Sequence, residues 1–145
     1  MKVSTKGKYA VQLMVDITLH NAGSCIALKD VSRRQNISVK YLEQVVGALT
    51  SGGFLKGARG PQGGYKLMPG MERSTVGDVL RAVEGSLYPV TAPDEMGTQE
   101  SNNGQQAVRA MWDGLYHVVT EYLDSITLED LARESIDGEQ DDYSI

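Results

Sequence analysis

One face of a predicted helix carries residues whose chemistry suits contact with nucleic-acid bases: Lys40, Glu43, Gln44 and Gly47. Glutamine can form two hydrogen bonds with adenine, glutamate can accept one from the cytosine amino group, and lysine can reach guanine or a phosphate. Gly47 costs the helix about 0.5–1 kcal/mol relative to alanine, but it removes a side chain where a duplex could approach closely. An ordinary solvated helix face with an incidental glycine would look the same, so the neighbouring segments must decide.

The apolar residues of this segment define the opposite, buried face of the helix. They recur at positions i, i+3, i+4 and i+7: Leu42, Val45, Val46 and Leu49. The turn Asn36-Ile37-Ser38 precedes the helix, and Ser38 is a favourable N-cap residue. A shorter helix is predicted before this turn, from Leu28 to about Gln35. Together these segments predict a helix-turn-helix.

A further helix is predicted at the start of the chain. Ser4 and Thr5 are candidate N-caps, and the residues after them repeat with helical period. The predicted buried stripe consists of Ala10, Leu13, Met14 and Ile17. We expect this helix to end by Asn21-Ala22-Gly23, because asparagine and glycine adopt the left-handed conformation of a C-cap.

A basic, glycine-rich segment follows the helix-turn-helix. Gly52-Gly53 ends the helix, residues 54–56 and 65–67 are predicted strands, and Arg59-Gly60-Pro61-Gln62-Gly63-Gly64 is the turn between them. This hairpin predicts a winged helix-turn-helix, in which Arg59 can enter a narrow minor groove. A nucleotide-binding phosphate loop is a poor alternative, because the motif lacks a Gly-Lys-Ser/Thr ending and leads into a strand.

The charge of the chain is divided between its two halves. Residues 1–70 contain ten Lys and Arg against three Asp and Glu, a balance of +7, whereas residues 71–145 have a balance of −12. The basic half is the candidate for binding a polyanion, although a solvated surface that happens to be lopsided remains the alternative. We therefore divide the chain into a DNA-binding domain (1–70), a helical dimerisation and regulatory region (71–136) and an acidic tail (137–145).

The bulk composition sets the broad class. The 145 residues are 41% hydrophobic and 23% charged, which is typical of a soluble globular protein. We expect no membrane span and no export signal. Cys25 is the only cysteine, so an intrachain disulfide is excluded, and we expect a cytoplasmic protein.

Several motifs together resemble the Rrf-two (Rrf2) family of bacterial winged-helix regulators. The matching segments are residues 4–10, 37–44, 59–65, 76–80, 83–85 and 126–131, so the resemblance covers almost the whole chain. It implies a homodimer that binds an imperfect palindrome near a promoter, mostly as a repressor. Thr50 departs from the arginine common at that place in the family, which puts one phosphate contact in doubt.

The resemblance also implies roles for individual residues. Base contacts are expected from Tyr41, Glu43, Gln44, Arg59 and Gly60. Phosphate contacts are expected from Ser4, Thr5, Lys6, Lys8, Ser38 and Lys40.

The second half of the chain predicts three helices and a loop. Thr75 and Asp78 form a capping box for a helix to about Glu84, and Thr127 and Asp130 cap a final short helix. Residues 86–104 are predicted to be a mobile loop, and residues 137–145 an acidic tail that is either flexible or awaits a partner. A long helix at 105–124 carries an apolar stripe that we assign to dimerisation: Val108, Met111, Trp112, Leu115, Val119 and Tyr122.

The sequence predicts neither a cofactor nor a metal site. Many members of the family hold an iron–sulfur cluster through three cysteines in the loop corresponding to 86–104, where this chain has none, and Arg109 stands where related chains have histidine. His20 and His117 lack metal-ligand spacing. The chain resembles the cluster-free CymR-type branch of the family, and this resemblance implies control of cysteine and sulfur metabolism with cysteine synthase as a co-regulator. Cys25 is either an oxidisable sensor thiol or a small semi-buried hydrophobic residue.

Two other classes of function are possible in principle. Catalysis is the weaker alternative, because the chain offers no nucleophile–base pair, carboxylate pair or metal-ligand set with recognisable spacing. The remaining alternative is an interaction adaptor that keeps the winged-helix fold without binding DNA. The polar face with Glu43 and Gln44, together with Arg59, favours DNA binding.

Overall fold

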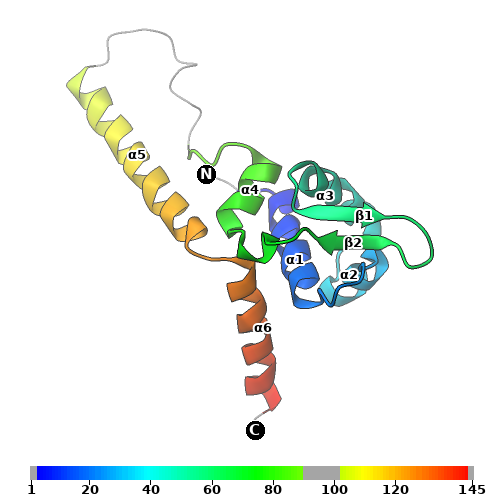
Figure 1. Cartoon of the computed structure of the whole chain (residues 1–145). Helices are drawn as coiled ribbons and strands as arrows, with labels where there is room; N and C mark the ends of the chain where they lie inside the picture. The colour runs from blue at the N-terminus through cyan, green and yellow to red at the C-terminus, as the bar shows by residue number, and fades with distance from the viewer. Residues whose placement is uncertain (1–2, 90–101, 144–145) are drawn as a thin grey trace.

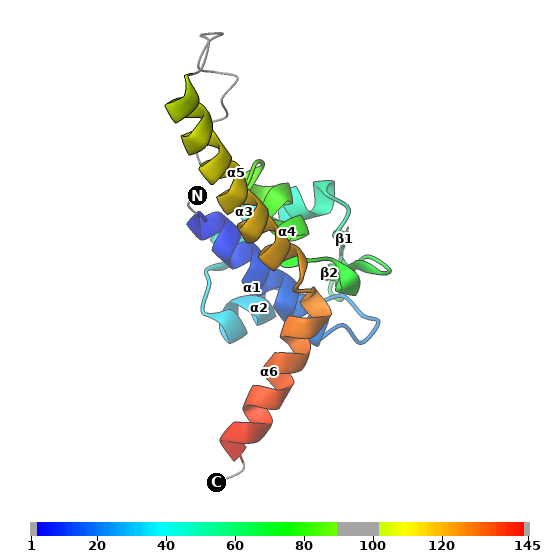
Figure 2. The same cartoon turned by 90° about the vertical axis from the view of Figure 1, so that its left-hand side faces the viewer.

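The computed structural model describes residues 3–89 and 102–143 of the chain. Within these ranges the chain is mainly helical, with one antiparallel pair of short strands. The central helix is α1 (Thr5–Leu19), and α5 (Asn103–Asp124) and α6 (Leu128–Tyr143) project from the body in different directions (Figures 1 and 2). The predicted fold class, mainly α with a small β-wing, is confirmed. None of the described helices is long and apolar enough to cross a membrane.

Helix α1 forms the middle of the core. The Ser4 side chain caps it by accepting a hydrogen bond from the Gly7 amide, and the predicted stripe is fully buried. The helix ends at Leu19, before Asn21 as expected, but the predicted left-handed cap is wrong. His20 instead closes the helix with φ −103°, and its amide donates to the Asp16 carbonyl at 3.1 Å. Gly23, with φ +86°, lies further along in the following turn.

The helix-turn-helix agrees closely with the prediction. It consists of α2 (Leu28–Gln35) and α3 (Val39–Ser51), and Asn36 turns the chain between them with φ +55°. Asparagine is one of the few side chains that tolerate this left-handed conformation. Ser38 caps α3 by accepting from the Tyr41 amide at 3.1 Å, as predicted.

The wing is a hairpin of β1 (Leu55–Ala58) and β2 (Gly64–Leu67), with Leu55 opposite Leu67 and Ala58 opposite Gly64. Ile26 extends it through a pair of backbone hydrogen bonds with Tyr65 at 2.8 and 2.9 Å. Gly64 has φ +140°, and a Cβ at this position would overlap the Ile26 carbonyl. The glycine therefore allows the segment before α2 to pair with the wing.

The second half of the chain completes the same core. The 3₁₀-helix η1 (Met71–Arg73) leads into α4 (Val76–Glu84), which begins with the predicted capping box. Val79 of α4 and Leu128 of α6 lie in one apolar cluster with Leu13. Residues from both sides of the predicted boundary at residue 70 thus share one core. The boundary therefore divides a basic segment from an acidic one, but it does not divide the hydrophobic core.

The last two helices extend beyond their predicted bounds. Helix α5 begins at Asn103, close to the predicted start at about Gln105, because Asn102 and Gln105 form a capping box. Helix α6 has 16 residues and is not short, and the predicted acidic tail is helical from Asp137 to Tyr143. The run of helix-compatible acidic and glutamine residues allows the helix to continue past Gly138. The predicted mobile loop lies outside the described residues over 90–101.

Candidate DNA-binding interface

The two faces of α3 differ as the spacing predicted. The four residues of the predicted buried stripe are at most 4% exposed, whereas Lys40, Glu43, Gln44 and Gly47 are exposed on the other side. A Cβ added at Gly47 would meet no atom within 4 Å, so internal packing does not explain this glycine. The exposed face is therefore available to a partner.

The first turns of α1 and α3 are held together by two tyrosines. Tyr41 is half-buried and packs edge-on against Tyr9, with ring centroids 5.1 Å apart at an interplanar angle of 87°. The Lys8 ammonium lies 5.9 Å from the centre of the Tyr9 ring. Tyr9 was not predicted as a site residue. Its place between Lys8 and the first residue of the buried stripe gave no sign of a contact with Tyr41.

The N-terminus of α1 presents several of the predicted phosphate-contacting residues. Thr5 and Lys8 are exposed and Lys6 is half-buried. The first amides of a helix have no acceptor within it and attract anions. Ser4 is already engaged, because its hydroxyl accepts from the Gly7 amide and donates to the Glu84 carboxylate. Its predicted phosphate contact would have to compete with Glu84.

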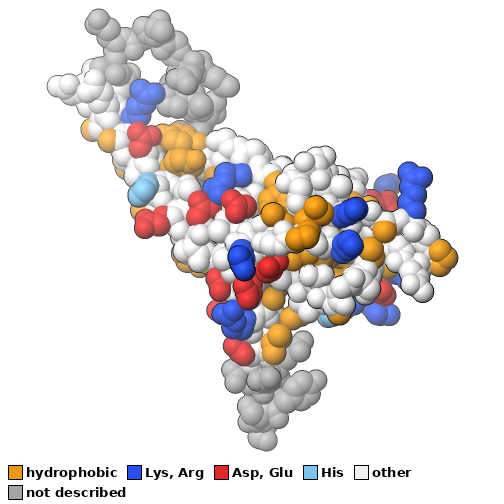
Figure 3. Space-filling model, viewed as in Figure 1, with side chains coloured by type: hydrophobic (Ala, Val, Ile, Leu, Met, Phe, Trp, Pro, Cys, Tyr) orange, Lys and Arg blue, Asp and Glu red, His pale blue; other side chains and the backbone are white. Residues whose placement is uncertain are grey.

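The tip of the wing is exposed, and its turn has a backbone conformation that favours glycine. Gly60 has φ +105°, and the Gly63 amide donates to the Gly60 carbonyl at 2.9 Å. Arg59 is exposed beside this turn, and the facing pair Lys56 and Lys66 lies exposed along the strands. Figure 3 shows Lys and Arg side chains toward the wing end of the body, whereas much of the visible acidic surface lies over the helices on the other side.

A buried ion pair fixes α2 against α1. The Asp16 carboxylate is 1% exposed and accepts two hydrogen bonds from the Arg34 guanidinium, at 2.7 and 2.9 Å, and one from Gln35 at 3.0 Å. Burial disfavours the charged carboxylate, but these hydrogen bonds outweigh it, so the pKa of Asp16 lies below its ordinary value. Arg34 therefore holds the helix-turn-helix in place and is not available as a surface cation.

The sequence position of Asp16 is itself a signal for a buried ion pair. Asp16 lies three residues after Leu13 and directly before Ile17, inside the buried stripe of α1. A charged residue at such a position requires a partner.

The predicted dimerisation stripe lies on an exposed face of α5. Among its six residues, Trp112 and Val119 are half-buried and the other four are exposed. Val118, which was not predicted, is also exposed at 63%. The half-buried residues Tyr116 and Leu123 on the inner side pack against a small cluster with Val76, Leu80 and Leu87.

The predicted sensor Cys25 is half-buried in the segment before α2 and directly precedes Ile26, which pairs with the wing. His20 Nδ1 donates to the Asp16 backbone carbonyl at 2.8 Å, and the ring of His117 is exposed on α5. No three potential metal-binding side chains come together among residues 3–89 and 102–138.

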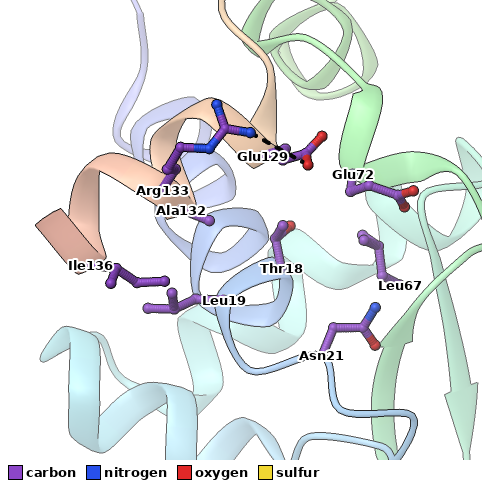
Figure 4. Close-up of a pocket in the computed structure, with 9 residues that line it drawn as sticks. All are labelled: Thr18, Leu19, Asn21, Leu67, Glu72, Glu129, Ala132, Arg133 and Ile136. Atoms are coloured by element: carbon purple, nitrogen blue, oxygen red, sulfur yellow. Dashed lines mark ion pairs between the residues drawn. The ribbon is translucent and has the colours of Figure 1, made fainter.

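An open pocket of about 370 Å³ lies at the opposite end of α1 from Ser4 (Figure 4). Its wall contains Glu72 and Glu129, and Arg133 is paired with Glu129 at 3.5 Å. Two carboxylates and one neutralised guanidinium make a poor site for DNA. The pocket is therefore separate from the candidate interface.

Comparison with known proteins agrees with this geometry. Residues 3–134 match the Rrf2 family, described as an iron-dependent transcriptional regulator. The chain is 37% identical to the HTH-type transcriptional regulator CymR of Bacillus subtilis over 143 residues, covering 99% of this chain and 97% of that protein.

Solved structures show the same likeness. The structure of CymR, the global cysteine regulator of B. subtilis, matches with a TM-score of 0.78 at 36% identity, covering 92% of this chain and 98% of that one. An oxidized form of Staphylococcus aureus CymR matches with a TM-score of 0.71 at 33% identity, covering 91% and 96%.

The iron in the family description can be compared with the donor residues of this chain. Iron–sulfur clusters are held by several cysteine thiolates. Cys25 is the only cysteine in the sequence, and it lies beside the wing rather than next to α5. The donor set does not fit a cysteine-ligated cluster.

Proposed function

Because the chain belongs to the Rrf2 family of transcriptional regulators, we propose that it is a sequence-specific repressor that binds operator DNA through α3, the wing and the start of α1. The relatives are regulators rather than enzymes, and so is this chain. The observation that carries the proposal is the exposed polar face of α3, which lies opposite a fully buried face. A helix of this form fits the major groove of B-DNA.

Individual residues take the following roles. Glu43 and Gln44 contact base edges from α3, supported by Tyr41, and Arg59 with Gly60 enters the minor groove at the wing tip. Phosphates are held by residues at the N-termini of α1 and α3: Thr5, Lys6, Lys8, Ser38 and Lys40. Ser4, the remaining predicted contact, could hold a phosphate only by giving up Glu84, to which its amide and hydroxyl both donate. The Tyr9–Tyr41 contact fixes the distance between these two helix ends.

The operator is a palindrome because the protein acts as a homodimer through α5. The exposed apolar residues of α5 alternate in steps of three and four, the spacing of a coiled-coil seam: Val108, Met111, Leu115, Val118 and Tyr122. A second copy of the same helix is complementary to such a seam. Dimerisation would set two recognition helices about 34 Å apart, one turn of the duplex.

The regulated genes belong to cysteine and sulfur metabolism in this proposal, in analogy with CymR of B. subtilis, the global cysteine regulator. Cysteine synthase is the proposed co-regulator, and Cys25 is the proposed redox sensor. CymR of S. aureus, a relative of this chain, has been solved in an oxidized form, and the redox role of Cys25 is proposed in analogy with it. The protein would act in the cytoplasm and associate with the nucleoid when bound to DNA. Alkylation of Cys25 should change operator affinity; unchanged affinity would contradict the sensor role.

Selection of bound duplexes from the host genome tests the proposal directly, and the recovered genes identify the signal. Affinity for the tightest duplex should fall with salt at a log–log slope of about −0.9 for each phosphate neutralised. Glu43→Ala should lose discrimination at cytosine positions, each worth about 1–3 kcal/mol. Absence of binding at low salt would instead support the interaction adaptor, and equal losses on specific and random DNA would contradict the role of Glu43.

A further inference from the structure

Two helix junctions in this structure are built in the same way. At the first, Glu84, the last residue of α4, reaches the N-terminus of α1. Its Oε1 accepts hydrogen bonds from the Ser4 amide, at 2.9 Å, and from the Ser4 hydroxyl. A Cβ on Gly7, in the first turn of α1, would overlap the same carboxylate oxygen. The absence of a side chain at Gly7 therefore permits the contact.

At the second junction, Asp124, the last residue of α5, reaches the N-terminus of α4. Its Oδ1 accepts from the hydroxyl of the cap residue Thr75 at 3.1 Å and from Arg81 at 2.6 Å. A Cβ on Gly77, in the first turn of α4, would overlap this oxygen. Both junctions thus consist of a carboxylate from a helix end, an N-cap hydroxyl and a first-turn glycine.

The two junctions connect α5, α4 and α1 in series. A carboxylate at a helix N-terminus is stabilised by the amides and dipole of that helix. Since each carboxylate is also the end residue of the preceding helix, a shift of one helix is passed to the cap of the next. The series begins at the proposed dimer helix and ends at the proposed phosphate-contacting end of α1.

We propose that Glu84 and Asp124 are positioning residues that fix the DNA-contacting end of α1 relative to the dimer helix. This inference rests on the proposed DNA interface and on dimerisation through α5. The series also explains two glycines, Gly7 and Gly77, whose positions the winged helix-turn-helix pattern alone does not require.

The sign of one substitution distinguishes positioning from simple electrostatics. A carboxylate close to DNA repels phosphates, so removing Glu84 should tighten DNA binding if charge were its only effect. Positioning predicts the opposite result for Glu84→Ala. Glu84→Gln should retain most of the affinity, because the amide oxygen can still accept from Ser4.

The experiment measures salt-dependent binding of the full-length protein to the tightest duplex recovered by genomic selection. Glu84→Ala and Gly7→Ala should each weaken binding about tenfold, equivalent to about 1.4 kcal/mol. Each should also reduce the steepness of the salt dependence by about 0.9 for every phosphate that the variant no longer neutralises. The double variant should be no weaker than either single one, since both remove the same interaction. Matched controls are Glu72→Gln, a half-buried acid of the pocket wall away from the interface, and Gly138→Ala, an unobstructed helical glycine.

The outcomes separate the failure of this inference from the failure of the proposed interface. Unchanged or tighter binding by Glu84→Ala and Gly7→Ala overturns the role of Glu84. If Lys6→Ala also leaves the salt slope unchanged, the placement of α1 on DNA is itself wrong. Thermal unfolding of every variant shows whether weaker binding is caused by loss of folded protein. In that case the folded molecules would keep the wild-type salt dependence of DNA binding. Such a result would also count against positioning.

The second junction is tested by comparing two duplexes, one with both half-sites and one with a single half-site. Asp124→Ala and Gly77→Ala should weaken binding to the full palindrome more than to the half-site, because they disturb the relative placement of the two winged helix-turn-helix units in the proposed dimer. Equal losses on both duplexes, or none, would overturn the role of Asp124.

Discussion

The winged helix-turn-helix and α5 differ in how far their apolar side chains are buried. In the former, Leu13, Leu42 and Leu49 are completely buried within one protomer. In the 22-residue helix α5 no residue is buried, and its apolar seam is 41–66% exposed. The first region is therefore complete in a single chain, whereas the second leaves an apolar surface exposed, which the proposed dimer would bury.

The difference has an energetic consequence. Full burial of a large aliphatic side chain stabilises a fold by about 1.5–3 kcal/mol. The core of the first region obtains this contribution in the monomer, and the seam of α5 obtains it only on association. Stability should consequently be independent of protein concentration for one region and dependent on it for the other.

The largest expected effect is a cavity in the core of the first region. Leu13→Ala should lower the free energy of unfolding by about 2–5 kcal/mol, because neighbouring helices cannot close around the missing atoms. Urea unfolding at several protein concentrations measures this decrease. Leu115→Ala is the matched change in α5 and should have an effect that grows with dimer formation. Equal, concentration-independent losses for the two variants would remove the distinction between the regions.

A charge in the seam of α5 should act on association instead. Leu115→Glu should weaken dimerisation by about 2 kcal/mol or more, roughly 30-fold, because two carboxylates would meet in an apolar interface. Sedimentation equilibrium gives the dissociation constant directly. Glu121→Ala, at a polar and exposed position of the same helix, is the control. A monomeric wild-type protein, or a Leu115→Glu variant that dimerises as strongly as wild type, would disprove the assignment of the seam.

The buried ion pair of the first region should give a smaller, pH-dependent effect. Asp16→Asn should cost about 1–3 kcal/mol, because the amide cannot replace the second acceptor for Arg34 in a buried site. The pKa of Asp16 is lowered in the folded protein, so its contribution is present above the ordinary aspartate value of about 3.9 and is lost as pH falls through the lowered folded value. Thermal unfolding from pH 7 to pH 2 should show the two proteins converging in acid. A constant difference across this range would indicate that ionisation of Asp16 is irrelevant.

The sequence pattern was sufficient for local structure and insufficient for contacts between distant segments. The caps at Ser38 and Thr75, the buried face of α3 and the glycine-rich turn of the wing all follow from residues within a few positions of each other. Such features are determined locally, by periodicity and by side chains that bond to nearby amides.

The missed features depend on residues that are far apart in the chain. Glu84 contacts Ser4 across 80 positions, and Asp16 contacts Arg34 across 18. The position of Asp16 in a buried stripe indicates that it needs a partner, but the spacing of the residues does not identify Arg34 as that partner, nor Ser4 as the partner of Glu84. The helical acidic segment after Asp137 was missed for another reason, since high charge was interpreted as disorder although acidic residues tolerate a helix.

The smallest expected effect concerns Gly47, where one substitution should change stability and operator affinity in opposite directions. Its surroundings are open, so Gly47→Ala should stabilise α3 by about 0.5–1 kcal/mol through the higher helix propensity of alanine. If a duplex lies against this face, the added methyl group should at the same time weaken operator binding. Unfolding in urea and anisotropy titration with the selected duplex measure the two changes. Gly114→Ala in α5, also in open surroundings, is the control for propensity alone. A variant of Gly47 that gains stability and keeps full affinity would show that the glycine is incidental and that DNA does not approach α3 closely there.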